Sequence, residues 1–567
     1  MPLGCRQHCL TQCSGPPSGT LLRALKQRRS PSRTTCFQEA ITLRLLPYSV
    51  LLLLTIALIP LVPREPLWLL LLTPVALLAL LGTWDLLQRP QNLRRNYPVL
   101  AHVRYLMEDV RPALRQYLFE SEEDGRPFPR EQRTLVYRRA KGVNDKVPFG
   151  TLQDYYAPGH EWIHHSIRPI EPTDVNLRVD VGGSDCSQPY SASVLNISAM
   201  SFGSLSANAI KALNRGARLG GFAHDTGEGG ISSHHRQGGD LIWEIGSGYF
   251  GCRDEKGRFE PVLFEERARD PQVKMVEIKL SQGAKPGSGG ILPAAKVSRE
   301  IAAARQVAIG VNCVSPSVHS AFDSPIGLLE FVALLRERSG GKPVGLKLCI
   351  GHPIEFMAIA KAMLATGIRP DFIVVDGAEG GTGAAPLELA NRVGTPLREG
   401  LIFARNILVG TGLKADIRLA ASGKVTSGYH LAANMALGAD WCNAARGFMF
   451  ALGCIQSLAC HTDHCPTGVA TQDPLRQRAL VVTDKAQRVA NYHAATLGAL
   501  SSIVGASGMR HPGELQPRHL QRRTGDLEVQ TAAELYTFLE PGELLAEPPQ
   551  AFARTWAAAS AERFALA

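Results

Sequence analysis

The segment DFIVVDGAEGG, residues 371–381, is an apolar run that ends in acidic residues and glycines. Its stretch of β-branched and aromatic residues is typical of a parallel strand that is covered on both faces. The glycines that follow allow the backbone to approach a ligand or another chain closely. The segment therefore predicts a buried strand that ends at a binding site.

Seven other runs repeat this pattern, and most of them precede a stretch rich in alanine and leucine. The runs are residues 193–202, 220–227, 273–283, 307–316, 344–351, 416–425 and 439–448, and the helical stretches include residues 206–219, 294–305, 325–338, 353–366 and 427–437. Strand–helix alternation repeated eight times predicts an α/β fold, a (β/α)8 TIM barrel. An open doubly wound sheet is the alternative, but no G-x-G-x-x-G motif follows the first run.

The composition is that of a folded globular protein, with 45% hydrophobic and 20% charged residues in a chain of 567. The net charge of +10 comes largely from the first 140 residues. A nucleic-acid-binding face would spread basic residues over the folded part or string them on one helix, and neither pattern occurs. The charge therefore predicts no nucleic-acid partner and fits a location beside a membrane.

Two uncharged apolar runs, residues 45–63 and 67–84, are separated by a short turn with one arginine and one glutamate. Each has about 18 residues, which is close to the length that spans a bilayer core. A signal peptide is the alternative, but the second run follows without a small-residue cleavage site between the two. Basic residues flank the pair on both sides. The positive-inside rule therefore predicts a transmembrane hairpin in the plasma membrane, in contact with membrane lipid, with the rest of the chain facing the cytoplasm.

These features divide the chain into five expected regions. They are a polar leader over residues 1–42, a transmembrane hairpin over 43–88, a preamble over 89–180 that packs on the barrel, a barrel over 181–520 with a cysteine-rich loop at 454–465, and a helical tail over 521–567. TIM-barrel active sites lie at the carboxyl ends of the strands. The polar clusters at those ends therefore predict an enzyme.

The last two strand ends predict a phosphate site. In barrels the loops after these strands commonly hold phosphate through backbone N–H groups, and here they combine small residues with cations. The residues concerned are Ser422, Gly423, Lys424, Ala444, Ala445 and Arg446. Ordinary loop glycines are the alternative interpretation.

Lys347 lies within the apolar run VGLKLCIG, where an unpaired ammonium group would be costly. It is therefore either paired with a buried acid or used by a ligand. A cation in such a position suits the N1/O2 edge of a flavin, because it stabilises the anionic reduced form. Gly380 and Gly381, at the end of the run 371–381, would let the backbone pass close to a flat ligand.

Other strand ends carry charges that suit an anionic substrate. Gln282 and Lys285 follow the run 273–283, and the segments around them also supply Glu228 and Arg305. Cations bind the carboxylates of a dicarboxylate, and a single acid group can hold or release a proton. Each of these residues by itself could instead form a structural ion pair.

Cys454, Cys460 and Cys465 lie within twelve residues of one another and precede a proline. Thiolates in such an arrangement are typical iron–sulfur ligands. Three ligands rather than four indicate a cluster with one corner missing. A zinc site that also uses His461 or His464 is the alternative.

Five segments give the chain a specific resemblance. They are NISAMSFGSLS (196–206), AHDTGEGG (223–230), SQGAKPGSGGILP (281–293), DGAEGGTGAAP (376–386) and CIQSLACHTDHCPTGVATQ (454–472). In this order they resemble the FMN-binding synthase domain of glutamate synthase, over roughly residues 190–475. Stand-alone FMN-binding glutamate synthase family proteins are the closer match, because the segments RNYPVL…RYLMEDVRP and REQRTLVYRRAK resemble their preamble.

The resemblance implies FMN in the barrel mouth and a 3Fe–4S cluster on the three cysteines. By motif match the catalytic residues are Glu228, Gln282 and Lys285, the substrate-binding residues are Ser247 and Arg305, and the cofactor-binding residues are Ser201, Lys347, Gly380, Gly381 and the two phosphate loops.

The implied reaction is hydride transfer from reduced FMN to the imine of 2-oxoglutarate and ammonia, or an amine, to give L-glutamate. Electrons would arrive through the iron–sulfur cluster. The sequence indicates neither a cysteine nucleophile domain that releases ammonia from glutamine nor a further domain with a dinucleotide fingerprint. An external electron donor, a ferredoxin or a reductase subunit, is therefore expected. The alternatives are an FMN-dependent oxidoreductase acting on another 2-oxo or 2-hydroxy acid, and a membrane electron-transfer component.

Overall fold

The computed structural model describes residues 33–564, with side chains from residue 44 onward. The predicted polar leader over residues 1–42 therefore lies mostly outside the described residues. The chain divides into two compact units, one ending at Glu120 and the other beginning at Ser121.

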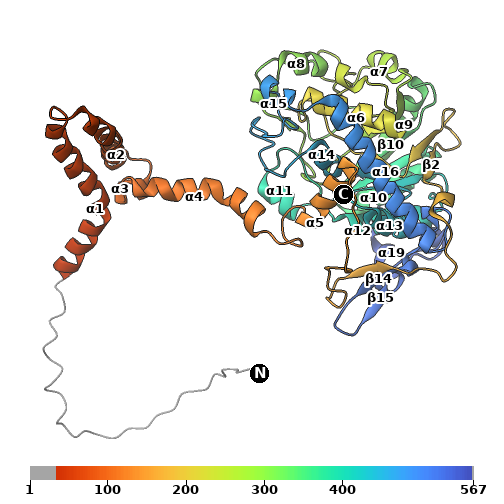
Figure 1. Cartoon of the computed structure of the whole chain (residues 1–567). Helices are drawn as coiled ribbons and strands as arrows, with labels where there is room; N and C mark the ends of the chain where they lie inside the picture. Colours follow the sequence, from red (N-terminus) through yellow and green to blue (C-terminus); the bar gives the residue numbers. More distant parts are fainter. Residues whose placement is uncertain (1–32, 565–567) are drawn as a thin grey trace, which may run out of the picture. The chain divides into compact units, whose positions relative to one another are not determined.

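The larger unit is built on a closed barrel of eight parallel strands (Figure 1). In barrel order these are β4 (Leu195–Ile197), β5 (His224–Asp225), β6 (Leu241–Ile245), β7 (Val273–Lys279), β10 (Val344–Leu348), β11 (Phe372–Asp376), β12 (Arg418–Ser422) and β13 (Trp441–Ala444). The barrel closes where β13 pairs with β4 in parallel register. The predicted (β/α)8 fold is confirmed.

One predicted barrel strand is wrong, and one real strand was missed. Residues 307–316 lie outside the barrel, where β9 (Cys313–Val314) pairs antiparallel with β8 (Ile291–Leu292). Ile309 and Val311 in this run are 59% and 57% exposed, so its apolar character does not reflect burial in a sheet. The third barrel strand is instead β6, a short run interrupted by a charged residue, and β7 is therefore the fourth strand.

The helices between the strands largely follow the predicted ranges. They include α6 (Ala207–Gly220), α8 (Arg299–Arg305), α9 (Pro325–Arg338), α10 (Pro353–Thr366), α12 (Leu397–Gly410), α13 (Gly428–Ala436) and α14 (Arg446–Leu452). Sequence signals explain several of the starts, since the Ser206 and Ser324 side chains accept hydrogen bonds from the first turns of α6 and α9. Residues 294–296 form a short 3-10 turn before α8, so the stretch predicted as a helix over 294–305 is interrupted.

Segments on both sides of the barrel in the sequence complete this unit. The helix α5 (Arg130–Lys141) and the long helix α16 (Val482–Ala506) pack together, and α16 also packs on α6 and α13. Strand β1 (Glu161–Ile163) pairs with β14 (Leu520–Arg523), which pairs with β15 (Val529–Thr531). The region expected to be a purely helical tail thus supplies strands as well as α17 (Ala532–Leu535), α18 (Glu543–Ala546) and α19 (Gln550–Ala558).

The smaller unit contains the two apolar runs as helices α1 (Arg33–Leu58) and α2 (Leu69–Leu87). The stretches Arg44–Leu61 and Pro66–Leu87 are long and apolar enough to cross a membrane, with mean hydropathies of 1.9 and 2.0. Helices α3 (Asn92–Asn96) and α4 (Leu100–Leu114) and a π-helical turn (Arg115–Phe119) follow. Residues 89–120, expected as part of a preamble on the barrel, therefore belong to the smaller unit.

Candidate active site

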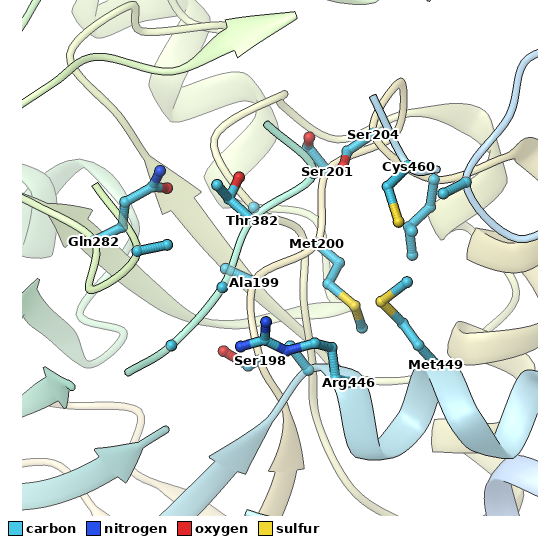
Figure 2. Close-up of a pocket in the computed structure, with 18 of the residues that line it drawn as sticks. Ser198, Ala199, Met200, Ser201, Ser204, Gln282, Thr382, Arg446, Met449 and Cys460 are labelled. Atoms are coloured by element: carbon cyan, nitrogen blue, oxygen red, sulfur yellow. The ribbon is translucent and has the colours of Figure 1, made fainter. Parts of the chain in front are cut away.

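A cavity of about 250 Å³ opens at the carboxyl ends of the barrel strands. Its walls come from the segments that directly follow β4, β5, β7, β11, β12 and β13, and from the loop that contains Cys454 and Cys460. Gln282 and Cys460 flank it from opposite sides (Figure 2). TIM barrels place their active sites at this end of the strands.

Most of the residues predicted from the sequence line this one cavity. They are Ser201, Glu228, Gln282, Lys285, Arg305, Lys347, Gly380, Gly381, Ser422, Gly423, Lys424, Ala445, Arg446, Cys454 and Cys460. Three predicted residues do not line it. The Ser247 hydroxyl, expected to face substrate, donates a hydrogen bond to the Pro316 carbonyl instead. Ala444 is buried within β13, and Cys465 is only 4% exposed.

Two cations stand together at the ends of β12 and β13. Partial burial and the charge of Arg446 lower the pKa of Lys424. Neither side chain forms an ion pair with any residue that the structure describes. The Arg446 guanidinium lies over the Phe128 ring, 5.2 Å from its centroid, and a Cβ at Gly381 would lie 1.5 Å from Nη1 of Arg446. The glycine therefore admits the guanidinium, and two neighbouring cations without an ion pair are an arrangement suited to an anion.

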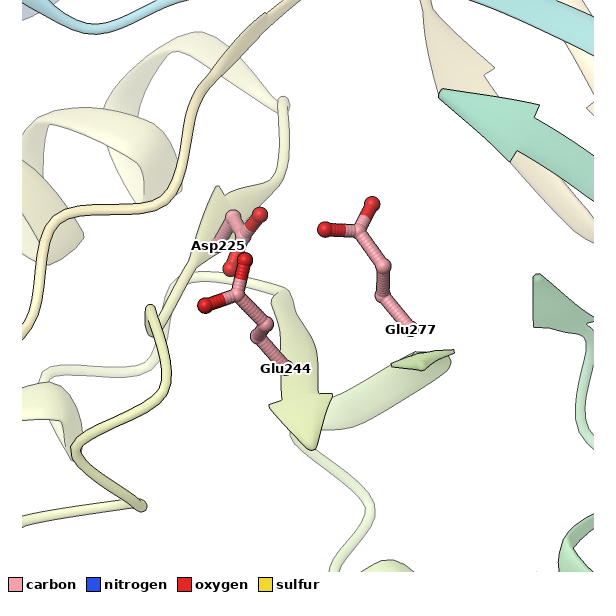
Figure 3. A group of neighbouring side chains, drawn as sticks. All are labelled: Asp225, Glu244 and Glu277. Carbon is pink, nitrogen blue, oxygen red and sulfur yellow. The ribbon is translucent and has the colours of Figure 1, made fainter. Parts of the chain in front are cut away.

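Lys347 lies inside the barrel among carboxylates from three neighbouring strands. Asp225, Glu244 and Glu277 place carboxylate oxygens within 4.8 Å of one another, and their side chains converge (Figure 3). The Lys347 ammonium group contacts the Glu244 carboxylate and lies 3.5 Å from Oε1 of Glu277. Asp225 also accepts a hydrogen bond of 2.9 Å from the Gly227 N–H. Lys347 is thus both ion-paired and part of the cavity wall.

Burial and mutual repulsion make this cluster retain protons. Burial, followed by the charge of Glu244, raises the pKa of Asp225 to about 7. Burial and the charge of Asp225 raise the pKa of Glu277 well above its usual range. Burial alone would lower the pKa of Lys347, but the surrounding carboxylates raise it well above its ordinary value. The lysine is therefore charged at neutral pH, and the three acids together are not all ionised.

The sequence interpretation missed Glu244 and Glu277. Each is a charged residue inside an apolar strand, in LIWEI and VKMVEIK, which is the same signal that singled out Lys347. Glu244 was missed because its strand was missed. Glu277 was missed because a single acid in a strand does not reveal which neighbouring side chain it meets.

A second charged cluster surrounds Glu228 in the wall of the same cavity. Lys279 Nζ is 3.0 Å from Glu228 Oε2 and donates to Gln282 Oε1 at 2.9 Å. Burial would raise the pKa of Glu228, but Lys279, Arg305 and Lys285 together lower it below its usual value. Three cations therefore surround one ionised carboxylate, which leaves an excess of positive charge for an anionic substrate.

The cysteine loop places two thiols at the cavity and a third in the protein interior. Burial raises the pKa of Cys454 to about 12 and also raises that of Cys460. The charges of Arg446 and Lys296 act in the opposite direction on Cys460. Lys296 is itself buried and donates to the Ala470 carbonyl at 3.0 Å. The cations lie where a group carrying several thiolates would need compensating charge.

The spacing of the cysteines bears on the two predicted metal sites. Zinc–sulfur bonds of about 2.3 Å hold the ligand sulfurs of one ion within about 4.6 Å of each other. Among the described residues, the group of potential ligand atoms within 4.8 Å is the carboxylate cluster, and the three thiols do not form such a group. His461 and His464 are both exposed. In a polynuclear cluster, by contrast, each thiolate binds a different iron.

Comparison with known proteins identifies the family of this chain. A family model described as the conserved region in glutamate synthase matches residues 173–510, which include the whole barrel and the cysteine loop. This chain belongs to the glutamate synthase family. The membership confirms the resemblance found in the sequence and the prediction of a glutamate synthase-like oxidoreductase.

Two relatives show how the match is distributed. The glutamate synthase large subunit-like protein YerD of Bacillus subtilis is 37% identical over 497 residues, which are 80% of this chain and 94% of that protein. The archaeal-type glutamate synthase (NADPH) of Thermotoga neapolitana is 34% identical over 313 residues, and the match spans only 58% of its length. A solved structure of mandelate oxidase is similar with a TM-score of 0.37 and 17% identity, and the match covers 70% of this chain and 98% of that one.

Proposed function

We propose that this glutamate synthase family chain binds FMN and 2-oxoglutarate in the barrel cavity and forms L-glutamate with ammonia or an amine. The observation that supports this most is the division of one cavity into distinct charged parts. The pair Lys424 and Arg446 lines one part of the cavity, and the cluster around Glu228 lines another. Lys347, on strand β10, also lines the cavity. Each part matches one requirement of a flavin-dependent reductive amination.

The residues present fit FMN. Lys424 and Arg446 would hold the phosphate, because they are neighbouring cations without an ion pair within residues 33–564. Lys347 would hold the N1/O2 edge of the ring, because the surrounding acids keep it charged. The bound cofactor supplies two-electron hydride chemistry. The residues around Glu228 would bind the substrate and handle its protons.

The balanced reaction consumes 2-oxoglutarate, ammonium, two electrons and two protons, and yields L-glutamate and water. Lys279, Lys285 and Arg305 would bind the two substrate carboxylates through charge-assisted hydrogen bonds. Burial lowers the pKa of Lys285, although Glu228 opposes this, so its Nζ can release a proton more readily than an exposed lysine. Glu228 stays ionised and holds Lys279 in place. Gln282 fixes the same lysine from the other side.

Electrons would enter through a 3Fe–4S cluster held by Cys454, Cys460 and Cys465. The support for this is the soft donor set together with the buried cation Lys296 beside it. The external donor would be a ferredoxin or a reductase subunit.

The helices α1 and α2 would anchor the chain in the plasma membrane, with the barrel unit facing the cytoplasm. Their apolar stretches are almost wholly exposed, with 6% and 11% buried, which a core helix of a soluble domain would not be. Arg44 precedes the pair and Arg89, Arg94 and Arg95 follow it, so both flanks are basic.

The test uses the purified full chain under anaerobic conditions. Flavin and iron are quantified per chain, the cluster is sought by EPR, and the reduced protein is then mixed with 2-oxoglutarate and ammonium. We expect both cofactors, and reoxidation of the flavin with formation of L-glutamate. Omission of ammonium, and replacement of 2-oxoglutarate by a monocarboxylate 2-oxo acid, serve as controls.

Other outcomes would redirect the proposal. Flavin with turnover of a 2-hydroxy acid, and none with 2-oxoglutarate, would favour the alternative flavoenzyme. Both cofactors without turnover of any 2-oxo acid would favour an electron-transfer component. Lys285→Gln should abolish glutamate formation, whereas Lys274→Gln, at a partly exposed lysine that does not line the cavity, should leave it intact.

A further inference from the structure

Helix α4 carries an exposed apolar stripe. Leu100, Val103, Leu106, Met107 and Leu114 are 47%, 56%, 56%, 51% and 38% exposed. These positions are separated mostly by three, four or seven residues. Because an α-helix has 3.6 residues per turn, such separations place the side chains on one face of the helix. Large apolar side chains gathered on one side of a helix need a covering partner.

Arginines line one edge of this stripe. Arg104 follows Val103 directly and Arg115 follows Leu114, while Arg111 lies four residues after Met107. Each therefore lies at the border of the apolar face, from which a long side chain can reach outward while its stem covers apolar surface. Arg104 also forms an ion pair of 2.9 Å with Glu108 on the same helix.

The start of α4 is fixed to the end of α2. Asp85, near the end of α2, is fully buried and accepts a hydrogen bond of 3.0 Å from the Val99 N–H. His102 in the first turn of α4 lies 2.9 Å from the same carboxylate. Val99 has a φ of 66°, which is rare for a β-branched residue and is maintained here by these contacts. The first turn of α4 is thereby held at the level where the apolar helix α2 ends.

Charge argues against a third membrane span. Helix α4 continues into the π-helical turn, and the segment 100–119 carries five charged residues, which are costly in a bilayer core. An amphipathic helix with basic residues along its apolar face is instead typical of the membrane–water interface. Helix α4 leaves the hairpin at the end of α2 and points away from it (Figure 1).

We propose that α4 lies in the membrane interface, with its apolar stripe among acyl chains and Arg104, Arg111 and Arg115 bound to the phosphates of anionic lipid headgroups. This inference rests on the proposed membrane anchor, which places the end of α2 at the interface. The partner is the lipid surface rather than a second copy of the chain. The contacts of Asp85 with Val99 and His102 hold the start of α4 against the end of α2, and the proposed anchor places that end at the lipid surface.

The first experiment is hydrogen exchange of the full chain in lipid nanodiscs, with the lipid either zwitterionic or partly anionic. We expect α1 and α2 to be protected in both, and α4 to be more protected in anionic discs, with the difference lost at high salt. Exchange of α4 that is equal in both lipids would overturn the inference while leaving the anchor standing. Unprotected α1 and α2 would overturn both.

Variants separate lipid binding from a general effect of charge. The triple substitution Arg104→Gln, Arg111→Gln and Arg115→Gln should remove the dependence of α4 protection on anionic lipid. The matched triple Arg392→Gln, Arg478→Gln and Arg518→Gln removes the same charge from exposed positions of the barrel unit and should keep that dependence. Equal behaviour of the two triples would contradict the proposal.

A photocrosslinker tests the face directly. Benzoylphenylalanine at Val103 should give lipid adducts by mass spectrometry, whereas the same group at Tyr105, about 160° around the helix from Val103, should not. Adducts of the Val103 probe with protein, either a second copy or the barrel unit, would show that the stripe is a protein interface and would overturn the inference.

Discussion

Lys347 owes its charge to residues on neighbouring barrel strands rather than to solvent. A buried ammonium group is stable only with partners, and here Glu244 and Glu277 supply them on β6 and β7. The three acids of this cluster bring more negative charge than one lysine can balance, so part of that charge is neutralised by bound protons. Acids that retain protons thus lie beside Lys347, a residue expected to contact the cofactor.

The proton on Asp225 gives a pH prediction. Its pKa is about 7 in the folded protein and close to 3.8 when exposed, so folding favours the protonated form. The stability contributed by that proton is present at low pH and is lost as pH rises from about 4 to about 7. Asp225→Asn keeps an oxygen that can accept from the Gly227 N–H but removes the titration.

We therefore expect the unfolding free energy of Asp225→Asn, relative to the natural chain, to increase between pH 4 and pH 7. Urea unfolding followed by tryptophan fluorescence at several pH values measures it. A difference that is constant with pH would contradict the assigned proton. The exposed Asp526→Asn serves as a control that should show no such trend.

Glu228 gives the second residue-level prediction. Glu228→Gln removes the carboxylate that Lys279, Lys285 and Arg305 surround. These cations still attract a dianion, but the carboxylate no longer positions them or affects the pKa of Lys285. We expect kcat for glutamate formation to fall about 10²–10⁴-fold, the usual range for a proton-transfer group or its positioning partner. KM for 2-oxoglutarate should not rise. Steady-state kinetics, with the exposed Glu266→Gln as control, tests both values.

At the scale of elements, the pair α6–α16 shows how small residues set helix distance. A Cβ on Gly216 of α6 would lie 2.4 Å from Cγ1 of Val489 on α16. Gly216→Ala should therefore destabilise the fold by about 1–3 kcal/mol, as overpacking does. The added Cβ would also lie 2.6 Å from Cβ of Val489, which Val489→Ala would keep. Val489→Gly removes both of these side-chain contacts, so Gly216→Ala combined with Val489→Gly should recover part of this loss. Unfolding free energies of the two single variants and the double variant complete the cycle.

An absence of coupling in that cycle would mean that the helices adjust by sliding instead. Such freedom would be unexpected, because α16 also packs against α5 and α13 and cannot move from α6 alone.

At the scale of the whole molecule, the cysteine loop joins the barrel mouth to the protein interior. Cys454 and Cys460 line the cavity, while Cys465 is buried. Cys454→Ser should lower the iron content per chain to a small fraction of its value while flavin is retained, because the residues proposed for FMN lie on the barrel strands. Iron and flavin analysis measures both. Cys186→Ser, at a cysteine outside this loop, should change neither, and parallel loss of iron in both variants would contradict the assignment.

The sequence by itself determined the barrel class, most of the cavity residues and the two apolar helices. These features are carried locally: apolar runs predict strands, glycines and charges mark their ends, and a TIM barrel brings all those ends to one face whatever the register. This is why Glu228, Lys424 and Cys460, far apart in the chain, could be assigned to one cavity before any contact was known.

Only the tertiary structure decided which charges meet. Residues 307–316 are as apolar as a strand but lie outside the barrel, whereas LIWEI, with its glutamate, lies within it. The acids around Lys347 come from three different strands, and their meeting depends on the stagger between neighbouring strands, which no local pattern encodes. Likewise, the hydroxyl of Ser247 is engaged by the Pro316 carbonyl, a contact 69 residues away. Long-range pairing of this kind is fixed by packing and burial, and the physical reason is that a sequence specifies each side chain but not its neighbours.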